Sequence, residues 1–183
     1  TGDVILSGAN TYSGGTVVNG GTLTSYAGSA AGTKAMFGTG VVTVNSGATV
    51  RFLADSTGNS MTYANTFNLN SASLISQDAN VTVNGTLALS GANTMNVVYS
   101  DKSATLAGVV GGTGSITKTG PGTLTLSNNG NTSSGGVTVS AGTFAVSAGT
   151  GAGAKSLSGT GSVTVNNVGS VRVGAGSTSS STG

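Results

Sequence analysis

The sequence predicts an all-β fold, a single-stranded right-handed parallel β-helix of roughly nine coils. Three observations support this: a strand-forming composition, a long internal repeat, and short alternating apolar triplets separated by Gly-rich turns. The 183 residues include 33 Gly and one Pro, and only 5% of them are charged, against about 25% in a typical soluble domain. The apolar residues are largely Val, Leu and Ala among many Thr and Ser, which indicates strands rather than disorder.

The internal repeat has one fixed offset. Residues 8–52 align with residues 130–173, so that Gly21 matches Gly142, a difference of 121. Self-similarity over this length favours a solenoid. We therefore expect one β-helix segment with a first unit at 1–120 and the start of a second unit at 121–183. No leader sequence is recognised, so we expect this segment to belong to a longer chain.

The triplets predict the coils. Each puts two apolar side chains on one face of a strand and a small or polar side chain on the other. Strands of about 3–6 residues with short turns give coils of roughly 20 residues, or about six coils per unit. The expected core positions are Leu87, Leu89, Leu124, Leu126, Val137, Val139, Val163 and Val165. An antiparallel sandwich is the competing fold, but its turns usually come every 8–12 residues and it lacks a long offset.

Residues 112–144 carry the most specific motif. It reads Gly114-x-Ile116-x-Lys118-x-Gly120-Pro121-Gly122, then Leu124-x-Leu126, Gly135-Gly136 and Ala141-Gly142-Thr143. This motif resembles the autotransporter-associated β-strand repeat, also called the passenger-associated transport repeat. Another copy enters at Asp3 and contains Gly14-Gly15, but its Tyr12 is replaced by Ser133 in the later copy. We expect the motif residues to be structural.

The resemblance implies a bacterial surface protein. In that family the passenger is a β-helix that a C-terminal barrel exports across the outer membrane. We therefore expect a structural stalk or display segment, exported to the cell surface, that supports adhesion or biofilm formation. The alternative is an extracellular fibre or matrix protein that stacks end to end, and a polysaccharide-active β-helix enzyme is a third reading. The expected partners are flanking coils, other copies of the chain, and surface glycans or other cells.

Acidic residues give the one candidate metal site. Asp55, Asp78 and Asp101 are evenly spaced in the sequence, and coils of roughly 20 residues would place them on successive coils. Such an acidic ladder would bind a cation, whereas solvated turn residues are the simpler interpretation. We expect no cofactor and no catalytic residue, so the chain is not expected to be an enzyme.

Other site classes have weak support in the sequence. The chain has no Cys and no His, and its net charge of +2 forms no basic patch, which argues against a thiolate metal site and against nucleic acid. No apolar run approaches the roughly 18 residues of a membrane span. Residues 149–156 nearly spell a phosphate-binding loop, but Ala154 stands where Gly is needed. Ser115 and Lys118 fit an S-x-x-K motif without its partner motifs.

Overall fold

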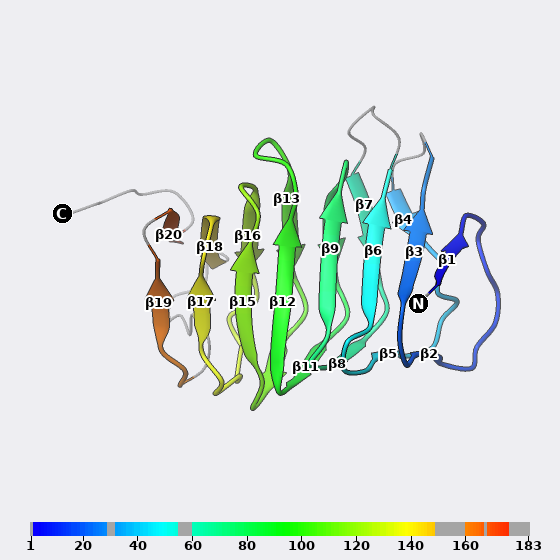
Figure 1. Cartoon of the computed structure of the whole chain (residues 1–183), viewed down its shortest axis with the longest axis horizontal. Coiled ribbons are helices and arrows are strands. Elements are labelled where there is room, and N and C mark those ends of the chain that lie inside the picture. Colours follow the sequence, from blue (N-terminus) through cyan, green and yellow to red (C-terminus); the bar gives the residue numbers. More distant parts are fainter. Residues whose placement is uncertain (1, 29–31, 55–59, 149–159, 167, 176–183) are drawn as a thin grey trace.

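The chain is a parallel β-solenoid of about seven turns. The computed structural model describes residues 2–28, 32–54, 60–148, 160–166 and 168–175. These residues form 20 strands in three sheets, and the paired strands are parallel throughout. No helix occurs among the described residues. Figure 1 shows the strands of the largest sheet side by side along the long axis, from β19 at one end to β1 at the other.

Each coil contributes strands to the three sheets in turn. Sheet A contains eight strands: β1 (Asp3–Leu6), β3 (Thr22–Tyr26), β6 (Thr49–Leu53), β9 (Ser73–Gln77), β12 (Ala92–Val97), β15 (Ser115–Thr119), β17 (Val137–Val139) and β19 (Val163–Val165). Sheet B contains five: β2 (Thr16–Val18), β5 (Val42–Val44), β8 (Phe67–Asn70), β11 (Leu87–Ser90) and β14 (Val110–Gly112). Sheet C contains seven: β4 (Gly32–Lys34), β7 (Ser60–Tyr63), β10 (Asn80–Val83), β13 (Ser103–Leu106), β16 (Thr123–Leu126), β18 (Gly142–Ala148) and β20 (Gly169–Ala175).

The coils are longer than the sequence suggested, so the expected count of nine is wrong. Seven steps of strand pairing lead along sheet A from Asp3 to Thr164. The number of residues between them is larger than seven coils of roughly 20 residues would contain. The steps also differ in length, from the shortest, between Asp3 and Thr22, to the longest, between Gly32 and Met61. Apart from β18 and β20, which have seven residues each, the strands are as short as expected, and most of the extra length lies in the corners between sheets.

The core lies inside the coil, where side chains from the three sheets meet. Six of the eight expected core residues, Leu87, Leu89, Leu124, Leu126, Val137 and Val139, are at most 3% exposed. Val163 is only partly buried and Val165 is 47% exposed. Both residues lie on β19, the last strand of sheet A, which has a paired neighbour on one side only. Near the other end, the rings of Phe37, Phe52, Tyr63 and Phe67 pack into one buried aromatic cluster.

The two repeat copies are rotated around the axis rather than stacked on the same faces. Thr22 lies on β3 in sheet A, whereas its match, Thr143, lies on β18 in sheet C. Five strand pairings along sheet A, and thus five turns of the solenoid, lead from β3 to β17. The next strand in the chain, β18, lies on sheet C, one third of a turn further. The 121-residue unit therefore spans five and one-third turns rather than six. Equivalent outward residues face different directions: Arg51 lies on sheet A and Arg172 lies on sheet C.

Candidate functional site

Lys118 is the most unusual residue of the transport-repeat motif. Its side chain points into the solenoid from β15 and is fully buried. The ammonium donates hydrogen bonds to the carbonyl oxygens of Thr119 at 2.6 Å, Gly120 at 2.7 Å and Ala141 at 3.2 Å. Thr119 ends β15, Gly120 begins the corner after it, and Ala141 lies on the same corner one coil later. Lys118 thus links two successive corners from inside.

Burial disfavours the charged form of Lys118. Loss of hydration lowers the pKa of its ammonium from 10.5 to about 8. A buried Lys is rare unless its charge is compensated, and here the acceptors are neutral carbonyl groups. The strand reads Ser115-Ile116-Thr117-Lys118-Thr119, so Lys118 has the same parity as the buried Ile116. That alternation is the sequence signal that identifies Lys118 as an inward residue.

We expect Lys118 to make the stability of the fold depend on pH. Below pH 8 the residue is protonated in both states; between pH 8 and 10 the folded chain releases this proton while the unfolded chain keeps it. Stability rises with pH wherever the unfolded state binds more protons, so this residue should add about 1–2 kcal/mol across that interval. Urea unfolding at pH 7 to 10 should show the rise in the wild type and not in Lys118→Met. If the stability of the two proteins changed with pH in the same way, the prediction would be contradicted. The test stops at pH 10 because burial raises the pKa of Tyr63 from 10.0 to about 12, which acts in the opposite direction.

The Gly120-Pro121-Gly122 corner needs its glycines for close backbone contact. Gly120 has φ of 73°, and a Cβ there would lie 2.3 Å from the carbonyl oxygen of Val97. A Cβ on Gly122 would lie 2.4 Å from the carbonyl oxygen of Tyr99. Pro121 lies between them and is exposed. The next strand, with Leu124 and Leu126 inward, then pairs directly with β13 and β18.

The Gly14-Gly15 and Gly135-Gly136 steps have similar backbone contacts at the second Gly and different contacts at the first. A Cβ on Gly15 would lie 2.9 Å from the carbonyl oxygen of Val41, and a Cβ on Gly136 would lie 2.8 Å from that of Ser162. A Cβ on Gly135 would lie 2.3 Å from the carbonyl carbon of Gly114, on the preceding coil. Gly14 has nothing within 4 Å of its Cβ position. The same motif position is therefore sterically closed in one copy and open in the other.

Two of the three acidic candidates share a corner. Asp78 follows β9 and Asp101 follows β12, so both lie where sheet A leads into sheet C, on successive coils. Asp78 is a turn residue with φ of 58°. Asp101 pairs with Lys102 at 2.5 Å, and this hydrogen bond lowers the pKa of the carboxyl. Asp55 lies outside the described residues, and no group of three potential metal ligands occurs within the part that is described.

The S-x-x-K motif gains no geometric support. Lys118 points inward, whereas Ser115 lies on the opposite, outward face of the same strand. The two side chains therefore do not face each other as a nucleophile and its base would. The phosphate-loop candidate, residues 149–156, falls outside the residues that the structure describes. A cavity of about 20 Å³ between sheets A and C is lined mainly by apolar side chains, including Leu74, Val81 and Met95, and it is large enough for about one water molecule.

One ladder of polar side chains runs along the solenoid. Asn19, Asn45, Asn70 and Ser90 form a chain of side-chain hydrogen bonds of 2.7–2.8 Å where sheet B leads into sheet A. The nearly regular spacing of the three Asn residues along the chain was the available signal for this ladder.

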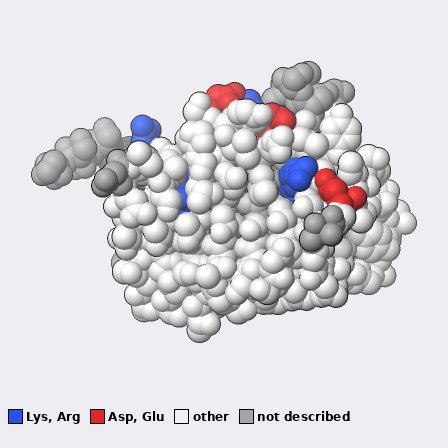
Figure 2. All heavy atoms as spheres, in the orientation of Figure 1, with Lys and Arg blue, Asp and Glu red and all other residues white. Residues whose placement is uncertain are grey.

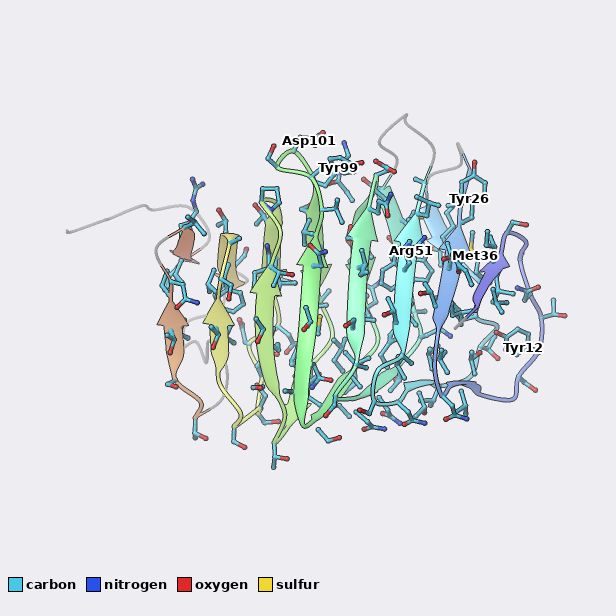
Figure 3. The ribbon with its side chains drawn as sticks, viewed as in Figure 1. Tyr12, Tyr26, Met36, Arg51, Tyr99 and Asp101 are labelled. Carbon is cyan, nitrogen blue, oxygen red and sulfur yellow. The ribbon has the colours of Figure 1, made fainter. Side chains whose placement is uncertain are left out.

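The arginine of sheet A lies on the outward face of its strand. Arg51 is partly exposed and pairs with Asp3 at 3.4 Å across sheet A. Figure 3 shows Arg51 on the outer face of that sheet, and Tyr99 and Asp101 together at the corner loop after β12. The charged side chains of this region therefore lie on the outside of the coil, in contrast to Lys118.

Comparison with known proteins gives one match. The family model of the passenger-associated transport repeat matches residues 1–24 and 116–146, less than a third of the chain. The second match includes Lys118, the Gly-rich corner and the Gly135-Gly136 step. No curated protein and no solved structure shows a significant match. None of the described residues forms a helix with the length and hydrophobicity of a membrane span.

Proposed function

Because the chain carries two passenger-associated transport repeats within one β-solenoid, we propose that it is a rigid stalk in the exported passenger of an autotransporter-type surface protein. The continuity of the solenoid is the observation that carries this proposal. Sheet A runs without a break through eight strands, and seven steps of about 4.8 Å give a rod roughly 34 Å long. A binding region joined to this stalk is held away from the membrane and serves adhesion or biofilm formation.

The proposed role is mechanical and includes no catalytic step. Of the candidate acids, Asp78 and Asp101 lie on a corner as turn residues, and Asp101 is neutralised by Lys102. The charged side chains in view gather in a few places, while most of the surface is uncharged (Figure 2). A stiff rod with a fixed coil height and few charges suits a spacer better than a site for general acid–base chemistry, which needs a pair of positioned titratable groups.

Export provides the direct test. The chain is placed between a signal peptide with an epitope tag and the β-barrel of an autotransporter. We expect the tag to be reached by antibody on intact cells, and a version with the chain duplicated to hold the tag farther from the membrane. The distance is measured by fluorescence quenching from a membrane dye. A folded chain that stays in the periplasm, or a tag whose height does not change on duplication, would contradict the role as an exported spacer.

End-to-end assembly is a second candidate. Val4, Ile5 and Val17 at one end are 59–61% exposed, and Val165 and Val173 at the other are 47% and 63% exposed. Strand edges with apolar side chains favour pairing with another chain, and a head-to-tail contact that does not close produces a filament. Sedimentation over a hundredfold dilution distinguishes the two roles, because a filament shortens on dilution and a single stalk does not.

A further inference from the structure

At one outward position, sheet A carries a hydroxyl side chain on each of seven successive coils. Strand pairing places these residues directly beside one another across the sheet. We call this set the hydroxyl row; it consists of Thr22, Thr49, Ser73, Thr94, Thr117, Thr138 and Thr164. Neighbouring strands lie about 4.8 Å apart, so the row repeats at that interval along the rod.

Strand propensity alone does not explain the hydroxyl row. Thr fits outward strand positions well, but the next outward position of the same strands is mixed. Two residues further along, β3, β6, β9, β12 and β15 carry Thr24, Arg51, Ile75, Asn96 and Thr119. The hydroxyl row also keeps its register although the connecting coil is longer between Thr22 and Thr49 than between Thr117 and Thr138. On sheet A a hydroxyl is thus retained at this outward position and not at the next one.

The hydroxyls of this row are available to a ligand. Within the described chain, none of the seven makes a side-chain hydrogen bond to another residue, in contrast to Thr24, which donates to Asp3. Six of them are partly exposed and Thr164 is exposed. A ligand that binds them therefore displaces water and breaks no contact within the protein.

The face around the hydroxyl row selects a neutral partner. On the front surface in Figure 2, a basic and an acidic patch lie side by side toward the β1 end, a smaller basic patch lies toward the β19 end, and further charged atoms lie along the upper edge, while most of the surface is uncharged. Arg51 and Asp3, which both lie on sheet A near this end, pair with each other. An anionic or cationic polymer would find few opposite charges beside the row, because Arg51 is already paired with Asp3, whereas a neutral polymer with many hydroxyl groups meets groups like its own.

We propose that the hydroxyl row of sheet A binds an extended, neutral polysaccharide that lies along the axis of the rod. This inference rests on the proposed surface role and names the class of partner for it. Thr and Ser hydroxyls both donate and accept hydrogen bonds, as sugar hydroxyls do. A sugar ring in an extended chain is about as long as one coil is high, so successive rings meet successive Thr side chains.

Affinity should come from the number of coils that the ligand covers. One neutral hydrogen bond contributes little, because it replaces bonds to water. When the contacts are linked along one polymer, their free energies add, because the translational and rotational entropy of binding is lost only once. A disaccharide should therefore bind weakly, and each additional ring should strengthen binding until the row is filled.

A matched pair of variants tests the proposal. The first changes Thr49, Thr94, Thr117 and Thr138 to Val, which keeps the β-branched shape and removes the hydroxyls. The control makes the same four-residue change in sheet C, at Thr62, Thr82, Thr105 and Thr125, which also form a row. That row contains five Thr residues, since Thr33 pairs with Thr62, and it is shorter than the hydroxyl row because it continues into Ala145 and Arg172. A third variant, with Ser at the four sheet A positions, restores the hydroxyls.

Binding is measured by calorimetry with the series from cellobiose to cellohexaose and by pull-down on amorphous cellulose. We expect affinity to rise along the series and to fall about tenfold or more in the sheet A Val variant, with little change in the control and recovery in the Ser variant. Unfolding midpoints confirm that all variants fold. Equal weakening by both Val variants, or no gain from longer glucans, would overturn the proposal. So would tighter binding of alginate, or inhibition of ice recrystallisation by this row without glucan binding. Export in the assay above does not depend on these hydroxyls, so the two ideas fail separately.

Discussion

Leu126→Ala should destabilise the solenoid by about 2–5 kcal/mol, from lost burial and from the cavity left behind. Leu126 is fully buried on β16, with Leu106 and Val146 beside it on the adjacent coils. Neighbours held at a fixed coil height cannot easily close around the missing atoms. The free energy of unfolding in urea provides the measurement.

Thr125→Ala is the control for this substitution. Thr125 is adjacent to Leu126 on the same strand but faces outward and is only partly buried. Its loss should change stability by no more than about 0.5 kcal/mol, as is usual for surface positions. Equal losses for the two variants would show that the inward and outward faces of β16 are wrongly assigned.

Gly135→Ala should cost about 1–3 kcal/mol or more, the usual range for an overpacked site. A Cβ at this position would lie 2.3 Å from the carbonyl carbon and 2.4 Å from the carbonyl oxygen of Gly114. Both atoms belong to the backbone of the neighbouring coil, so relief requires the coils to separate locally. Thermal or urea unfolding of the variant should show the loss as a lower midpoint.

Gly14→Ala is the matched control, because Gly14 occupies the same position in the other copy of the motif. Its Cβ would meet nothing within 4 Å, and its φ is not in the positive region. Stability should therefore stay within about 0.5 kcal/mol of the wild type. If Gly14→Ala were as damaging as Gly135→Ala, the need for Gly at this position would come from the motif itself and not from contact between coils.

Alternation and the internal repeat were sufficient to predict the type of fold. The triplets around Leu87, Leu124 and Val137 placed their apolar residues correctly inside, because a strand has a period of two wherever it occurs. Val163 and Val165 have the same pattern but lie on the last strand of sheet A. A sequence pattern shows which face of a strand is inward and does not show whether another coil covers it.

Coil length and the rotation of the repeat could not be predicted in the same way. The local sequence pattern limits the length of each strand, whereas the corners differ in length from coil to coil. A small underestimate of the length of each coil therefore raised the expected number of coils from seven to nine. A sequence offset of 121 gives no angle around the axis until the coil length is known. Lys118 was recognised as part of the motif, but its charge concealed the parity that it shares with Ile116, and its carbonyl partners depend on the corner of the next coil.

The continuous stacking of coils along sheet A is most directly tested with spin labels. The chain has no Cys, so Cys variants at pairs of row positions carry the labels at defined sites. With one label fixed at position 22, the second is moved from 117 to 138 to 164, which are four, five and six coils away. The solenoid predicts narrow distributions centred near 19, 24 and 29 Å, with equal increments of about 4.8 Å per coil. Distances that are broad, or that fail to increase from each site to the next, would contradict the stacked coil.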